Sequence, residues 1–238
     1  MNIDYNYDRN LHTIVGPTAA WPKLFPDGIP ASILDVGCGA GTWLKTAMIA
    51  GVTDVFGIDG VEIPAEQLHI PANKFLCRDL RLPIDLGRHF DVVLCLEVAE
   101  HLEASSSGPL ITTLTKHSNT VIFSAACPGQ SGQHHVNCQW PEYWQQLFNS
   151  VGYVCEDTLR FRLWNDSNIE FWYKQNMFIA RQDPQAGKEP RLKAIIHPEM
   201  QVLFEEYIIT IENGHMPISW YFKAPPIAVF RKIARKCF

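Results

Sequence analysis

Acidic residues and a histidine stand close together at the segment Glu97-Val98-Ala99-Glu100-His101, directly after the most apolar run of the chain. If this segment turns into a helix, Glu97 can face the same way as Glu100 and His101, three and four residues further on. Two carboxylates and an imidazole placed in this way can bind a divalent cation or raise the basicity of the histidine. A simpler interpretation stays open, in which the acids favour the positive end of a helix and Glu97 contacts a cofactor.

Two more imidazoles, those of His134 and His135, lie in the loop 126–139 after a second apolar run. Both segments follow predicted parallel strands, so they can converge at one edge of a sheet. The segment 97–101 and this loop then predict either a site for a divalent cation or a metal-free base, His101 or His135. His134 and His135 can also be ordinary exposed loop residues.

A glycine-rich turn, Asp35-Val36-Gly37-Cys38-Gly39-Ala40-Gly41, lies between a predicted strand and a predicted helix. Glycines permit a tight turn and a close ligand, and the following helix offers free N–H groups. The spacing fits neither the phosphate-binding G-x-x-x-x-G-K-[ST] pattern nor the dinucleotide pattern G-x-G-x-x-G, which disfavours a nicotinamide-dependent oxidoreductase. An acid before the glycines suits a ligand with an ammonium group, although a purely structural loop stays the alternative.

Short apolar runs bounded by turn residues predict strands that alternate with helices, which favours a parallel α/β sheet. Two aromatic-rich runs, 153–164 and 171–180, are expected to form an antiparallel hairpin at the sheet edge. Most aromatic residues from 161 to 222 are expected in the core, with some lining an acceptor pocket. The other predicted strands are 33–36, 54–58, 74–77, 90–96 and 120–124, with helices at 42–50 and 141–151.

The segment ILDVGCGAG at 33–41 resembles the class I S-adenosylmethionine-dependent methyltransferases, with supporting matches over about residues 31–181. The resemblance implies a Rossmann-like, seven-stranded, mostly parallel sheet with an antiparallel C-terminal hairpin. It also implies that the glycine turn packs against the methionyl part of S-adenosylmethionine, that Asp59 holds the ribose hydroxyls and that Asp79 contacts the adenine amino group. The cofactor-binding residues implied in this way are Asp35, Gly37, Cys38, Gly39, Gly41, Asp59, Gly60, Asp79, Leu80 and Glu97.

The Glu-x-x-Glu-His element with a later histidine is similar to two metal-assisted groups in that family. These are the small-RNA 3′-terminal 2′-O-methyltransferases and the ubiquinone-pathway catechol-type O-methyltransferases. In the RNA group, two Glu and two His hold one Mg²⁺ or Mn²⁺ against a vicinal diol. Glu97, Glu100 and His101 match the first part well, whereas His135, or His134, matches the second part loosely.

The remaining segments suggest a three-part organisation. Residues 1–30 hold four prolines and are expected to form a helical cap and linker, residues 31–181 the cofactor-binding core, and residues 182–238 a helical extension. Helices are predicted near 198–213 and 225–238. The latter has a basic amphipathic pattern, which suits a solvated surface helix and, as an alternative, peripheral contact with a membrane.

Composition narrows the function classes. The 238 residues include 20 Lys and Arg against 25 Asp and Glu, a formal charge of −5, so the chain has no global basic field for DNA or RNA. Seven cysteines without a C-x-x-C pair indicate neither a disulfide framework nor a zinc knuckle, and they favour a cytoplasmic location. No apolar run approaches the ~18 residues needed to span a bilayer.

We therefore expect a cytoplasmic methyltransferase that modifies an oxygen of a small, hydroxyl-rich acceptor, such as a sugar or a natural-product intermediate. RNA terminal 2′-O-methylation and a non-catalytic cofactor-binding module are the alternatives.

Overall fold

The computed structural model describes residues 13–202, and every structural statement below concerns these residues. The chain divides into two compact units, Met1–His197 and Pro198–Phe238, and the fold described here belongs to the first. Residues 198–202 are helical, as the sequence predicts, whereas the rest of that helix and the one at 225–238 lie outside the described residues. The domain boundaries after residues 30 and 181 stay predictions.

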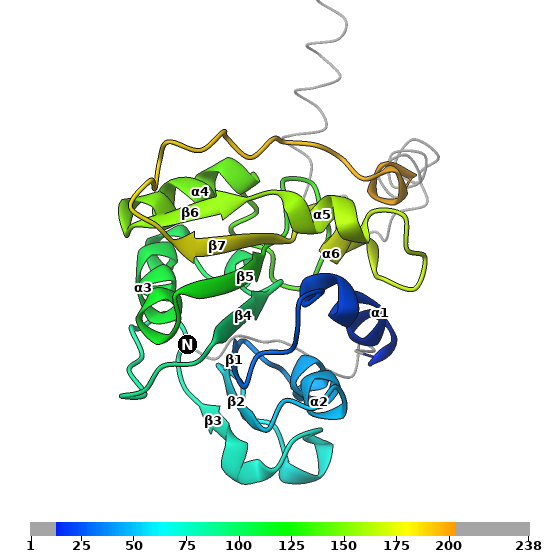
Figure 1. Ribbon diagram of the computed structural model, residues 1–238, viewed down its shortest axis with the longest axis vertical. Helices are drawn as coiled ribbons and strands as arrows, with labels where there is room; N and C mark the ends of the chain where they lie inside the picture. The colour runs from blue at the N-terminus through cyan, green and yellow to red at the C-terminus, as the bar shows by residue number, and fades with distance from the viewer. Residues whose placement is uncertain (1–12, 203–238) are drawn as a thin grey trace, which may run out of the picture. The chain divides into compact units, whose positions relative to one another are not determined.

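A seven-stranded sheet in the order β3-β2-β1-β4-β5-β7-β6 forms the centre of this unit (Figure 1). The first five strands pair in parallel, while β7 runs antiparallel to both β5 and β6. This is the predicted Rossmann-like arrangement. The strands are β1 (Ser32–Val36), β2 (Asp54–Asp59), β3 (Phe75–Cys77), β4 (Val92–Leu96), β5 (Thr120–Ser124), β6 (Tyr153–Glu156) and β7 (Phe178–Gln182).

Helices cover both faces of the sheet (Figure 1), which explains why β4 is buried along its whole length. Buried side chains of α3 and α4 form the core on one face, and those of α1, α2, α5 and α6 form the core on the other. The segment predicted as a helical N-terminal cap contains α1. The helices are α1 (Val15–Leu24), α2 (Thr42–Ile49), α3 (Ser107–His117), α4 (Pro141–Ser150), α5 (Thr158–Leu163) and α6 (Phe171–Asn176), with 3-10 turns at Ala65–Gln67, Ala72–Lys74, Ala99–His101 and Ala104–Ser106.

The two aromatic-rich runs differ from their prediction. They were expected to be strands throughout, but only 153–156 and 178–182 pair as β6 and β7, and α5 and α6 lie between them. Leu159 and Leu163 stand four residues apart and are both buried, which is the spacing of one helix face. The aromatic content of this segment is typical of a strand, but the four-residue spacing of its buried leucines favours a helix.

The register of the parallel strands sets the position of the site. Val36 pairs with Ile58, and Leu96 pairs with Ser124, so β1, β2, β4 and β5 end side by side. The glycine turn, Glu97 and the loop 126–139 follow these strand ends, and Asp59 is the last residue of β2. Ligands of open α/β sheets bind at this edge.

Truncation of Phe123 tests the packing between β5 and the helices. Its fully buried ring lies 5.2 Å from that of Trp144, 5.5 Å from Phe148 and 5.4 Å from Phe178. We expect Phe123→Ala to lower the free energy of unfolding by about 3–5 kcal/mol, because the cavity it leaves cannot fully collapse. Urea denaturation followed by circular dichroism measures this. The control Phe161→Ala, at a side chain 59% exposed, is expected to change it by less than about 0.5 kcal/mol; equal effects would contradict the described core.

Candidate functional site

A cavity of about 530 Å³ opens at the carboxyl edge of the sheet. Its wall includes the turn after β1, the ends of β2 and β4, part of the loop 126–139 and residues of α6. Gly41 is outside this wall and instead caps the N-terminus of α2, with a positive φ of 88°. The other predicted site residues all line the cavity: Asp35, Gly37, Cys38, Gly39, Asp59, Gly60, Asp79, Leu80, Glu97, Glu100, His101 and His135.

The glycine turn is held in place by the neighbouring strand and by a close approach. Gly37 donates its amide hydrogen to the Ile58 carbonyl at 2.7 Å, and Gly39 donates to Asp59 Oδ2 at 2.8 Å. Gly37 has a φ of 84°, and a Cβ atom there would lie 2.3 Å from Val98 Cγ2. Only glycine therefore fits at position 37 without displacing Val98.

Asp35 and Asp59 place two carboxyl groups beneath this turn. Asp35 is buried, and burial together with the charge of Asp59 raises its pKa to about 8. Asp59 also accepts the Val61 amide hydrogen through Oδ1 at 2.9 Å, so it ties the turn to the segment after β2. A cationic ligand beside Asp35 would favour its ionised form.

Asp79 is the exposed carboxyl group of the cavity wall. Arg81 donates to it through the backbone amide, at 3.0 Å, and through Nε, at 2.8 Å, and the side-chain hydrogen bonds lower the pKa of Asp79 to about 2. Asp79 and the buried Leu80 thus combine a charged acceptor with an apolar surface.

Glu97 does not join a helix with Glu100 and His101. It has a left-handed φ of 56°, and the 3-10 turn begins only at Ala99. Its carboxylate accepts hydrogen bonds from Gln130 Nε2 at 2.7 Å and Asn176 Nδ2 at 3.1 Å, while burial raises its pKa to about 7. Sequence analysis missed both amides, because a single Gln or Asn carries no spacing signal.

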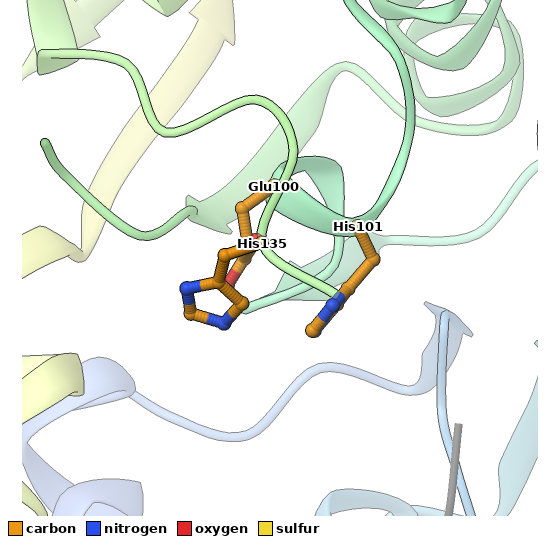
Figure 2. A group of neighbouring side chains, drawn as sticks. All are labelled: Glu100, His101 and His135. Carbon is orange, nitrogen blue, oxygen red and sulfur yellow. The ribbon is translucent and has the colours of Figure 1, made fainter. Parts of the chain in front are cut away.

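Glu100, His101 and His135 converge from the 3-10 turn and the loop 126–139 (Figure 2). Potential ligand atoms of the three residues all lie within 4.8 Å of one another. His134, the alternative to His135, is exposed and does not line the cavity. Three of the four predicted metal-binding residues are therefore brought together.

The electrostatics of this group leave several acceptor atoms available. Glu100 is fully buried, and burial and the charge of Glu97 raise its pKa. His135 Nδ1 lies 3.0 Å from the Gln130 carbonyl, to which it donates, so Nε2 carries the lone pair. Burial lowers the pKa of His101 to about 4, which keeps its imidazole neutral at physiological pH.

Comparisons with known proteins agree with this geometry. A family model described as a methyltransferase domain matches residues 7–175. The chain is similar to the solved plantazolicin methyltransferase BpumL, at 20% identity and a TM-score of 0.52 over 76% of this chain and 90% of that one. It is also similar to magnesium protoporphyrin IX methyltransferase (ChlM) from Synechocystis, at 18% identity and 0.52 over 71% and 82% of the two chains.

A third similar structure is the small RNA methyltransferase HEN1, at 18% identity and a TM-score of 0.51 over 74% of this chain and 25% of that one. At such identities these structures show the fold alone. No curated protein sequence matches the chain. Among the described residues, no helix has the length and apolar character that crossing a membrane requires.

The close approach at Gly37 leads to a first prediction for the site. We expect Gly37→Ala to abolish binding of S-adenosylhomocysteine in isothermal titration calorimetry, because the methyl group collides with Val98 and displaces the turn. Gly87→Ala is the matched control, since Gly87 has a positive φ of 66° but no atom within 4 Å of its Cβ position. Equal binding by the two variants would show that the close approach is unimportant.

The raised pKa of Asp35 predicts a pH dependence of stability. Between about pH 4 and 8 the unfolded chain releases this proton while the folded chain keeps it, so the free energy of unfolding falls as pH rises. Asp35→Asn removes the titrating group, and its melting temperature should decline less between about pH 5 and 8 than that of the wild type. Parallel pH profiles of the two proteins in differential scanning calorimetry would contradict this.

Proposed function

The chain belongs to the class I S-adenosylmethionine-dependent methyltransferase family, and we propose that it methylates an oxygen of a small, hydroxyl-rich acceptor such as a sugar or a natural-product intermediate. The observation that carries the proposal is the convergence of Glu100, His101 and His135 in the cavity that also contains the glycine turn. A cofactor and a hydroxyl group can therefore meet in one enclosed space.

The residues of the cavity wall suggest where each part of the cofactor would bind. The turn at Gly37 and Gly39 would pack against its methionyl part, with Asp35 near the ammonium group. Asp59 would accept hydrogen bonds from the ribose hydroxyls, and Asp79 would accept one from the adenine amino group beside Leu80. Support comes from the position of all these residues along one cavity wall.

For this reaction the protein has to align the acceptor oxygen with the methyl group of the cofactor and to remove the hydroxyl proton. The acceptor oxygen attacks the methyl carbon, the bond from that carbon to sulfur breaks, and uncharged S-adenosylhomocysteine leaves. In-line placement of the nucleophile supplies most of the rate. Because burial lowers the pKa of both His101 and His135, each imidazole is neutral and can take the hydroxyl proton.

The same group also fits a divalent cation. Glu100 offers a buried carboxyl group beside the two imidazoles, and His135 presents Nε2 because its Nδ1 is bound to the Gln130 carbonyl. Glu100, His101 and His135 would hold Mg²⁺ or Mn²⁺, which stabilises an alkoxide when bound. Glu97, the fourth predicted ligand, accepts hydrogen bonds from Gln130 and Asn176. It would hold these neighbouring segments in place and would not bind the metal itself.

RNA terminal 2′-O-methylation is the second candidate, favoured by the Glu-x-x-Glu-His element. The charge of the cavity opposes it: Arg81 is the only Lys or Arg among the described residues of the wall, and it is bound to Asp79. A phosphate-bearing strand would meet carboxylates instead of cations. Mass spectrometry of sugar and polyol acceptors incubated with isotope-labelled S-adenosylmethionine tests the function itself; cofactor binding without any labelled product would favour a non-catalytic module.

Metal binding is tested directly with Mn²⁺. We expect the wild type to bind Mn²⁺ in isothermal titration calorimetry and His135→Ala to bind it at least about tenfold more weakly, because one imidazole ligand is lost. His134→Ala is the matched control and should behave as the wild type, since its side chain is exposed outside the cavity. The affinity for S-adenosylhomocysteine should be the same in all three proteins.

Dialysis against EDTA should abolish methyl transfer, and Mg²⁺ or Mn²⁺ should restore it. Full activity after chelation would contradict the metal and leave a histidine as the sole base. In that case His101→Ala should still lose turnover while cofactor binding persists.

A further inference from the structure

The segment between β6 and β7 adds a wall to the cavity that the cofactor residues do not provide. An antiparallel pair needs only a short turn, yet residues 157–177 intervene and form α5 and α6. Glu170, Trp172 and Tyr173 from this segment line the cavity. Trp43 donates its indole hydrogen to the Tyr173 hydroxyl at 3.0 Å, which fixes α6 against α2 beside the glycine turn.

Glu170 holds a carboxylate that the described protein leaves unsatisfied. Its Oε2 atom is buried and has no hydrogen-bond partner among the described residues. Burial raises its pKa, and the charge of Lys174 opposes this effect only in part. Because burial disfavours the charged form of this carboxyl group, a cationic ligand beside it would favour ionisation and gain affinity.

Gly16 of α1 makes room for this carboxylate. A Cβ atom at position 16 would lie 1.7 Å from Glu170 Oε2, so any other residue there would displace the acid. Two elements far apart in the sequence, α1 and α6, thus keep the carboxylate at the cavity wall.

The other charges of the wall show what kind of group Glu170 can receive. Arg81 is paired with Asp79, and the two cavity histidines have lowered pKa values, so the described side chains of the wall offer no unpaired positive charge. The Trp172 ring is a surface on which a cation can also rest. The carboxyl groups of the wall are those of Asp35, Asp59, Asp79, Glu97, Glu100 and Glu170.

We propose that Glu170, together with Trp172, binds a protonated amine of the acceptor, so that the enzyme selects amine-bearing hydroxyl compounds over phosphorylated or carboxylated ones. This inference rests on the proposed function, because the same acceptor places its reactive oxygen at Glu100, His101 and His135. The ammonium group pairs with the carboxylate of Glu170, which lines the cavity, and an anionic substituent at that position is repelled.

Three catechols that differ in one substituent test this charge selection. Dopamine carries an ammonium group, 4-ethylcatechol carries none, and 3,4-dihydroxyphenylacetate carries a carboxylate, while the diol is the same in each. Isothermal titration into the full chain saturated with S-adenosylhomocysteine should show dopamine binding at least about tenfold more tightly than 4-ethylcatechol. The carboxylate compound should bind most weakly.

Glu170→Gln should reduce the preference for dopamine to less than about threefold and leave the affinity for S-adenosylhomocysteine unchanged. The matched control Glu66→Gln, at an exposed residue outside the cavity, should keep the preference. Equal binding of the three catechols, binding of none of them, or loss of S-adenosylhomocysteine affinity in Glu170→Gln would overturn the inference.

The two proposals fail in different ways. A wild type that does not bind S-adenosylhomocysteine, or that forms no methylated product from any hydroxyl compound, contradicts the proposed function. Intact cofactor binding and turnover without a charge preference contradict the role of Glu170 alone.

Discussion

The hydrogen bonds of Glu97 connect the parts on which the site depends. Its amide donates to the Ser124 carbonyl at the end of β5, and its carboxylate receives the side-chain amides of Gln130 and Asn176. The left-handed backbone at Glu97 ends β4 and turns the chain into the 3-10 turn that carries Glu100 and His101. One residue thereby fixes the strand end, the loop with His135 and the helix next to Glu170.

Burial gives the carboxyl groups of this edge different properties although they share one cavity. Asp79 is exposed and bound to Arg81, so its proton is released easily, whereas Asp35 and Glu97 hold theirs to higher pH. An acidic wall of this kind can be tolerated before ligands bind, because its most buried members are close to neutral. A cationic ligand bound at this wall would favour the ionised form of these buried carboxyl groups.

The predicted site residues that the structure brings to the cavity wall are those whose position follows from the local backbone. Gly37, Asp59 and Asp79 lie at or just after strand ends at motif spacing, and the structure places all three on the cavity wall. Gln130, Asn176 and Glu170 were missed, because they act through tertiary contacts with residues distant in sequence. The strand prediction for 157–164 and 171–177 was wrong, because aromatic residues occur in both strands and helices. Buried residues four positions apart, such as Leu159 and Leu163, indicate a helix instead.

The contact between Gly16 and Glu170 makes the two positions evolutionarily dependent on each other. An alanine at 16 would require the Glu170 carboxylate to move, whereas a shorter residue at 170 would leave that space open. The order in which substitutions arise therefore matters, and the effects of single changes at the two positions do not add. A change of acceptor preference through α6 would at the same time widen the set of residues that α1 can accept.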